Sequence, residues 1–328
     1  MNSLLSNLGL IFRGMAMGIA EVIPGVSGGT IAFITGIYEK LINTIKAFSP
    51  ALLGTFKNEG FAGLWKAING NFLAALMIGM VGGIVIGVFA VSYLLEEYPP
   101  MIWAFFFGLI ISSAIYIGRQ ITNWNVTAIL ALIIGTVVAY FITTITPANG
   151  SESLIVVFFA GAIAISALIL PGISGSFILL LMGMYSFIVT DTLKGALKTF
   201  AFDKIVTMAV FALGCLTGLM TISRLLSWTF KKYKNTTLAV LTGFMIGSLN
   251  KIWPWRQATD WLRDSGGKII MDDDGVTPKK ILTELNVSPM NYEAATGDEA
   301  YMIGAIVLMI VGFLSVFVFE KFGDSEEG

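Results

Sequence analysis

Two short segments of this 328-residue chain combine proline, glycine and hydroxyl side chains inside long apolar stretches. They are residues 24–30 (PGVSGGT, the first motif) and residues 171–176 (PGISGS, the second motif). Proline ends a helix, and glycine lets a ligand approach the main chain closely. A helix that restarts after such a break presents unpaired N–H groups and a positive dipole end, so each motif predicts an anion-binding site. The residues that would supply donors are Ser27, Gly28, Gly29, Thr30, Ser174, Gly175 and Ser176.

The two motifs occupy equivalent places in an internal repeat. Residues 14–38 align with residues 161–185 without a gap at an offset of 147, and nine of the 25 positions are identical. Close helix packing is the alternative explanation for either motif alone, since small residues have that role in membranes. A proline at the same place in both copies favours paired anion sites, as in transporters with discontinuous helices.

Glu21 lies one turn before Pro24, in a stretch with no other charged residue until Glu39. An ionisable group inside an apolar segment is costly, and for that reason it is a functional candidate. Its equivalent in the second copy is Leu168, so the acid belongs to one half only. We expect Glu21 to bind substrate and to carry a proton. The alternative is that it caps exposed N–H groups or pairs with Arg13.

Arg13 and Arg224 are the basic side chains placed deepest in apolar sequence. The forked donors of arginine match the geometry of phosphate, so both residues are candidates for substrate binding. Arg224 stands shortly before Lys231, and extension of its side chain to the membrane interface is an equally good explanation.

The composition predicts an all-α polytopic membrane protein. Hydrophobic residues make up 56% of the chain and charged residues 12%, against roughly 25% charged residues in soluble proteins. The net charge of −1 argues against a nucleic-acid partner. A bilayer crossing takes about 20 residues, and we predict spans at 71–95, 99–118, 126–146, 205–230, 237–252 and 300–319. Close helix packing is predicted at Gly79, Gly82, Gly83, Gly87, Gly214 and Gly218.

Each repeat is predicted to contain a re-entrant helical hairpin followed by three transmembrane helices. The first repeat covers residues 1–150 with its hairpin at 8–45, and the second covers 151–328 with its hairpin at 154–190. The stretch 8–45 is too long for one crossing and suits two half-depth helices. The repeats would then be inverted, and the motifs would meet near mid-membrane in one shared polar cavity. Four ordinary crossings in each half, giving parallel repeats, is the alternative.

The basic residues favour both termini on the cytoplasmic side. In the first half the predicted inner connections carry five basic residues and the outer connections carry none, whereas the second half is mixed. Residues 253–299 then form an extracytoplasmic segment. Its residues Trp253, Trp255 and Trp261 suit a belt at the membrane interface.

These motifs resemble those of the polyprenyl-phosphate transporters, a family long known only as a domain of unknown function. The resemblance rests on residues 13–14, 18–30 (GIAEVIPGVSGGT) and 171–176, and it extends over nearly the whole chain. It implies a bacterial inner-membrane protein that returns undecaprenyl phosphate from the outer to the inner leaflet for cell-envelope synthesis. It also implies re-entrant hairpins in inverted repeats, with a polyprenyl-phosphate lipid and the surrounding membrane lipids as partners.

The alternative function is a membrane undecaprenyl-pyrophosphate phosphatase, because such enzymes also use duplicated re-entrant helices with a similar motif. In that motif an arginine stands where this chain has Gly28 and Gly175, and the chain contains no histidine. Pyrophosphate cleavage needs charge neutralisation and an acid–base group within reach. We therefore expect no enzymatic activity, no cofactor and no metal ion.

Overall fold

The structure is a computed structural model that describes residues 2–22, 26–145, 151–185, 187–188, 192, 201–261 and 281–324. Several predicted features lie partly outside these residues. They are Pro24 and Gly25 of the first motif, the end of the hairpin at 154–190, the end of the span at 126–146, and part of the segment 253–299.

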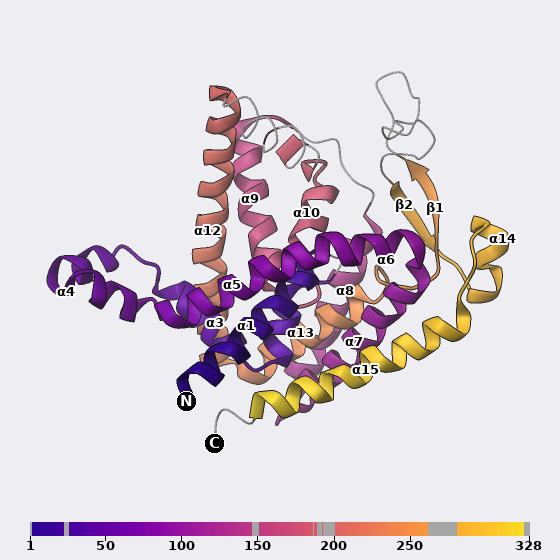
Figure 1. The fold of residues 1–328 in the computed structure, drawn as a ribbon, viewed down its shortest axis with the longest axis horizontal. Coiled ribbons are helices and arrows are strands. Elements are labelled where there is room, and N and C mark those ends of the chain that lie inside the picture. Colours follow the sequence, from indigo (N-terminus) through magenta and orange to yellow (C-terminus); the bar gives the residue numbers. More distant parts are fainter. Residues whose placement is uncertain are drawn as a thin grey trace.

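The described chain is mostly helical (Figure 1). The helices of the first half are α1 (Asn2–Glu21), α2 (Gly28–Ile34), α3 (Tyr38–Ala47), α4 (Leu52–Ala67), α5 (Gly70–Ile86), α6 (Ser92–Glu97), α7 (Pro99–Arg119) and α8 (Val126–Thr144), with a π-helical turn at Gly87–Val91. Those of the second half are α9 (Leu154–Ile169), α10 (Gly175–Leu181), α12 (Phe202–Lys232), α13 (Lys234–Ser248), α14 (Tyr292–Thr296) and α15 (Met302–Asp324).

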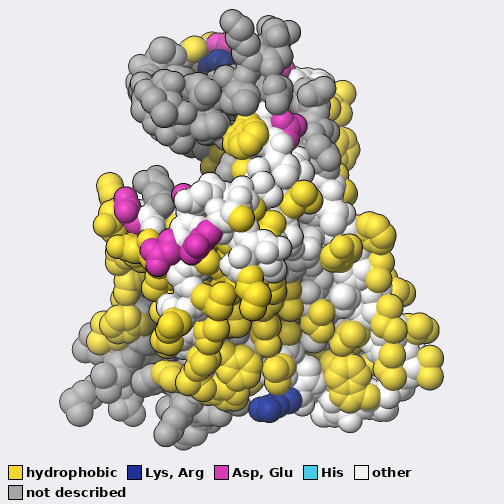
Figure 2. Space-filling view, turned by 90° about the vertical axis from the view of Figure 1, so that its right-hand side faces the viewer, with side chains coloured by type: hydrophobic (Ala, Val, Ile, Leu, Met, Phe, Trp, Pro, Cys, Tyr) yellow, Lys and Arg dark blue, Asp and Glu magenta, His cyan; other side chains and the backbone are white. Residues whose placement is uncertain are grey.

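Four helices among the described residues are long and apolar enough to cross a membrane: Gly70–Leu95, Pro99–Arg119, Val126–Thr144 and Phe202–Lys232. They overlap the predicted spans at 71–95, 99–118, 126–146 and 205–230. The predicted spans at 237–252 and 300–319 overlap α13 and α15. Figure 2 shows hydrophobic side chains over much of the face that α15 helps to form, and Ile303, Ile310 and Leu314 of that helix are exposed. Such an apolar exterior suits contact with lipid tails.

The long helices pack in four pairs that follow the internal repeat. Within the halves, α1 packs on α5 and α9 packs on α12, and between the halves α7 packs on α15 and α8 on α13. In chain order α1, α5, α7 and α8 correspond to α9, α12, α13 and α15. Exchanging the two halves therefore turns the pair α1–α5 into α9–α12 and the pair α7–α15 into α13–α8. This is the pattern expected of two halves related by a two-fold axis. The inverted orientation across a membrane stays a prediction.

Glycines bring the paired helices into close contact. A Cβ atom added at one glycine in each pair would overlap a main-chain carbonyl of the partner helix, as it does for Gly83 on Met15, Gly218 on Ala162, Gly312 on Phe105 and Gly243 on Leu132. The predicted packing role is confirmed for five of the six glycines named from the sequence. It is wrong for Gly82, which has no neighbouring atom within 4 Å of the Cβ position.

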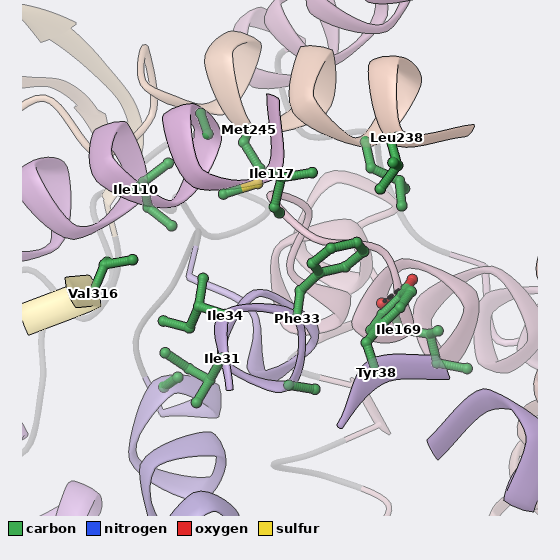
Figure 3. Packing of buried hydrophobic residues seen from close by; sticks show 14 of the residues in the cluster. Ile31, Phe33, Ile34, Tyr38, Ile110, Ile117, Ile169, Leu238, Met245 and Val316 are labelled. Atoms are coloured by element: carbon green, nitrogen blue, oxygen red, sulfur yellow. Dashed lines mark hydrogen bonds between the residues drawn. The ribbon is translucent and has the colours of Figure 1, made fainter. Parts of the chain in front are cut away.

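The short helix α2 lies at the centre of this assembly, and all seven of its residues are buried. Figure 3 shows Ile31, Phe33 and Ile34 of α2 packed opposite Ile117 of α7 and Met245 of α13. A helix of two turns is marginal on its own, so packing of this kind stabilises it. The described part of the first motif, residues 26–30, is thereby fixed in the interior of the protein.

A small β-sheet departs from the all-helical prediction. Strand β1 (Arg256–Trp261) pairs antiparallel with β2 (Ile281–Asn286), within the segment predicted to lie outside the membrane. The indole N–H of Trp253 donates to the Val287 carbonyl at 2.9 Å, and that of Trp255 donates to the Ala300 carbonyl at 2.9 Å. Trp255 is only 3% exposed, so the interface-belt interpretation is wrong for this residue, which instead fastens the sheet to the helices.

Candidate functional site

The donors at the start of α2 are already paired within the chain. The Gly28 N–H donates to Oε1 of Glu21 at 2.7 Å, and the Gly29 N–H donates to the hydroxyl of Ser27, the N-cap residue, at 3.0 Å. The Thr30 N–H donates to the Ser27 carbonyl at 3.0 Å. Glu21 therefore occupies the position that an external anion would take, which is the capping alternative left open by the sequence.

The start of α10 is arranged differently. Ser174 is its N-cap residue but makes no capping hydrogen bond, and its hydroxyl instead lies 2.9 Å from that of Ser176. Gly172 just before it has a φ of +84°, and a Cβ atom there would meet the backbone of Met245 at 2.9 Å. This position requires glycine both for its left-handed backbone and for its contact with α13.

The two motifs touch each other directly. The Ser27 hydroxyl donates to the Leu168 carbonyl at 2.9 Å, and the Gly172 N–H donates to the Thr30 hydroxyl at 3.2 Å. The Tyr38 hydroxyl adds a bond of 3.1 Å to the Ile169 carbonyl. Residues separated by more than 130 positions in sequence thus form one packed junction between the halves.

Replacing Ser27 with alanine is expected to lower the free energy of unfolding by about 2 kcal/mol. The substitution removes an N-cap and a buried bond to the other half, each worth roughly 1 kcal/mol. Ser166 is a matched control, because its hydroxyl bonds only to the Ala162 carbonyl one turn back in α9. Ser166→Ala should change stability by less than about 0.5 kcal/mol. Denaturant unfolding in detergent measures both, and equal losses would contradict the prediction.

A cavity of about 450 Å³ adjoins the junction and is lined by residues from both halves. Glu21 comes from the first half, and Ser176 comes from the second. The walls also include Trp103 of α7, Lys251, and Arg256 and Glu284 of the β-sheet. We call this the central cavity.

The predicted site residues are placed unequally around the central cavity. Glu21 and Ser176 line it, whereas Ser27, Gly28, Gly29, Thr30, Ser174 and Gly175 are buried beside it. The expectation that both motifs open onto one polar cavity therefore holds only for Ser176 in this conformation. The physical reason is that buried hydroxyl and N–H groups need partners, and here they find them in each other.

The two arginine candidates lie apart from this group. Arg13 is half-buried on α1, about 12 Å along the helix from Glu21 by the rise of 1.5 Å per residue. Arg224 is exposed on α12 and lies outside the central cavity. The structure thus brings Glu21 and Ser176 together but does not bring either arginine to them.

Sequence reasoning missed Lys251, Arg256 and Glu284, which complete the wall of the central cavity. Their sequence has the composition of a water-exposed connection, and nothing local indicates that the connection folds back. One usable signal was the pair of tryptophans between two basic residues at 251–256 (KIWPWR).

A second polar depression of about 140 Å³ lies at the junction of α3 and the end of α12. Its lining includes Ser227, Phe230 and Lys231, and Lys46 donates to the Ser227 hydroxyl at 3.2 Å. The ring of Phe230 contacts Tyr38 at a centroid distance of 5.9 Å. Since Tyr38 bonds to the junction between the motifs, aromatic rings fill the space between that junction and this depression.

Apolar helices of bilayer length, packed as two sequence-related halves that share a cavity lined by a few charged side chains, define an integral membrane protein. The profile of the family described as undecaprenyl phosphate translocase-like matches residues 17–270, and the chain belongs to this family. Its relatives include two proteins named polyprenyl-phosphate transporter. One, from Vibrio cholerae, is 42% identical over 97% of both chains. The other, from Staphylococcus aureus, is 33% identical over 74% of this chain and 85% of its own length. No solved structure matches the chain.

Proposed function

We propose that this protein moves undecaprenyl phosphate from the outer to the inner leaflet of a bacterial cytoplasmic membrane, where cell-envelope synthesis reuses the carrier. The observation that carries the proposal is the central cavity, in which Glu21 of one half and Ser176 of the other face the same space. A cavity at the interface of two repeats is where transporters built from such repeats bind their substrates. Two relatives that bear the name polyprenyl-phosphate transporter support the same substrate class.

Glu21 acts in this proposal as an internal anion that the lipid phosphate must displace. Its carboxylate accepts the Gly28 N–H, and a phosphate would compete for the same donor. Two negative groups in a cavity of low dielectric repel unless one of them takes up a proton. Proton uptake at Glu21 weakens its bond to Gly28 and exposes the start of α2.

The remaining site residues take their roles after this exchange. Phosphate oxygens would accept hydrogen bonds from the freed backbone of the first motif and from the start of α10, where Ser174 makes no capping hydrogen bond. Arg13 and Arg224 would bind the phosphate on its way to or from the motifs. The donors are Ser27, Gly28, Gly29, Thr30, Ser174, Gly175 and Ser176.

The inward path leads toward the depression beside Ser227 and Lys231, on the side where both termini are proposed to lie. In the described conformation the path is filled by Phe33, Tyr38 and Phe230, whose rings contact one another at 4.8 to 6.2 Å. A change that separates these rings would join the central cavity to the depression. The conformation described therefore corresponds to a state closed on that side.

Purified protein in proteoliposomes is expected to move labelled undecaprenyl phosphate and to release no phosphate from undecaprenyl pyrophosphate. The chain contains no histidine, and glycine stands at both places where the phosphatase motif has arginine. It therefore lacks the cation that would neutralise the leaving phosphate and the usual acid–base group for cleaving a pyrophosphate. Lipid movement is measured by accessibility of the headgroup, and cleavage by free phosphate. If the protein released phosphate at an enzymatic rate and the Glu21→Gln variant did not, the protein would be a pyrophosphatase rather than a transporter.

A further inference from the structure

Three charged side chains from separate segments meet at the edge of the central cavity. Oε2 of Glu284 accepts a hydrogen bond from Nη1 of Arg256 at 2.7 Å and another from Nζ of Lys251 at 3.0 Å. The side chains are 20%, 8% and 21% exposed, in that order. Two cations thus share a single carboxylate oxygen in a largely buried position.

The cluster carries an excess of positive charge. Burial raises the pKa of Glu284, but the charges of Arg256 and Lys251 and the bond from Lys251 outweigh it, so that the pKa lies below its ordinary value. One carboxylate therefore faces two cations. Among the described residues of the central cavity, the other acid is Glu21, whose Oε1 is occupied by the Gly28 N–H. An excess cation in a buried site favours binding of a further anion.

Arg256 also has one hydrogen-bond donor that is not matched by an acceptor among the described residues. Its Nε is buried and has no hydrogen-bond partner among the described residues. Cζ of its guanidinium lies over the Trp103 ring at 4.1 Å from the centroid, a cation–π contact that helps to hold the side chain in place. Glu284 binds Nη1, while Nε is covered in the described conformation, so a second anion would reach this edge as the cluster rearranges around it. Phosphate fits an arginine edge through paired hydrogen bonds.

The cluster stands where cavities meet. Arg256 and Glu284 line the central cavity, a neighbouring cavity of about 260 Å³ and another of about 610 Å³ on the side of the β-sheet. Trp103 lines both the last of these and the central cavity. A headgroup held at Arg256 is therefore in contact with the same space as Glu21 and Ser176.

We propose that Lys251 and Arg256 form a binding site for the phosphate monoester headgroup of the lipid substrate, on the β-sheet side of the central cavity. Glu284 holds the two cations in place when the site is empty. When the phosphate arrives, it replaces Glu284 as the acceptor of some of the hydrogen bonds from Lys251 and Arg256. The lipid identity of the ligand rests on the proposed function. Among the described residues Nε has no partner, so a phosphate oxygen would satisfy a buried donor that the cluster leaves unmatched.

The experiment measures binding of farnesyl phosphate, farnesol and inorganic phosphate to the purified full-length protein in detergent. Arg256→Gln is expected to weaken farnesyl phosphate binding roughly tenfold or more and to leave farnesol binding unchanged, because only charge-assisted bonds to phosphate are lost. Glu284→Gln is expected to tighten farnesyl phosphate binding, since it removes the competing carboxylate. Lys57→Gln, on exposed α4, is the charge control and should change nothing.

Tightening on Glu284→Gln is the result that a structural ion pair does not produce. Weakened binding in both the Arg256 and Glu284 variants, or parental binding in Arg256→Gln, would overturn the proposal. If Arg256→Gln fails to fold, Lys251→Gln carries the same expectation. Inorganic phosphate that binds as tightly as farnesyl phosphate would overturn the lipid assignment. A parent protein that moves no lipid defeats the proposed function, whereas an Arg256→Gln variant that moves lipid at the parental rate defeats this inference alone.

Discussion

Glu21→Gln is expected to abolish or strongly impair lipid movement in proteoliposomes while the protein still inserts and folds. Glutamine keeps the size of the side chain and an oxygen that can accept the Gly28 N–H, so the start of α2 stays capped. It removes the titration that would let the carboxylate release that donor in exchange for phosphate. The variant should therefore bind lipid phosphate yet fail to complete the transport cycle.

The measurement compares lipid movement and lipid binding across pH for the parent and the variant. The parent's rate is expected to depend on pH through Glu21, and the residual rate of the variant should lack that component. Glu59→Gln is the control, because Glu59 is exposed on α4 and lines neither the central cavity nor the depression beside Ser227. A variant with the parental rate and the parental pH profile would leave Glu21 as a structural cap.

Much of the site's local chemistry could be predicted from the sequence. The break in the first motif, the restart of a helix after Ser27 and the proximity of Glu21 to that restart all follow from residues close together in the chain. Capping of α2 by Glu21 was one of the alternatives considered from these residues. Such features are predictable because backbone donors at a helix start must be satisfied by something nearby.

The junction between the motifs could not be predicted in its details. The repeat indicates that the two motifs are equivalent, but it does not tell whether they leave an open space or close on each other. The bonds from Ser27 to Leu168 and from Gly172 to Thr30 join residues over 140 positions apart. Their formation depends on how α2 packs among α1, α7 and α9, which no local pattern encodes.

The charged cluster was missed for a related reason. Lys251, Arg256 and Glu284 stand in a segment whose composition is that of a water-exposed connection. This segment turns back over the helices because β1 pairs with β2 and because Trp255 bonds to the Ala300 carbonyl. Neither contact is visible in the local sequence. Tryptophan suits both an interface belt and a buried anchor, so its presence did not distinguish the two.

The hydrogen bonds that hold the junction are compatible with repeated opening. Three of them join the halves directly, those of Ser27, Thr30 and Tyr38, and each is worth roughly 0.5–1.5 kcal/mol net. A total of a few kcal/mol is within the range that binding of a charged headgroup can supply. The four glycine-packed helix pairs, in contrast, make extensive contacts that we expect to persist, so the short helices rather than the long ones would move.

Gly83→Ala is expected to destabilise the protein by about 1–3 kcal/mol, and Gly83→Leu by more, because both force atoms into a filled space. The new Cβ would overlap the Met15 carbonyl, and α1 would have to separate from α5. Since α1 carries Glu21, the separation should also reduce lipid movement. Unfolding in detergent and transport in proteoliposomes measure the two effects.

Gly82 provides the matched control, since it is the preceding residue of the same helix and has open space at its Cβ position. Gly82→Ala is expected to be neutral or to stabilise the protein by up to about 1 kcal/mol, because alanine is the better helix former. The two substitutions make the same chemical change to the same helix, so a difference between them reports only the contact with α1. Equal effects at both positions would show that α1 and α5 do not depend on this close approach, and the helix pairing described for the repeat would then be wrong at this crossing.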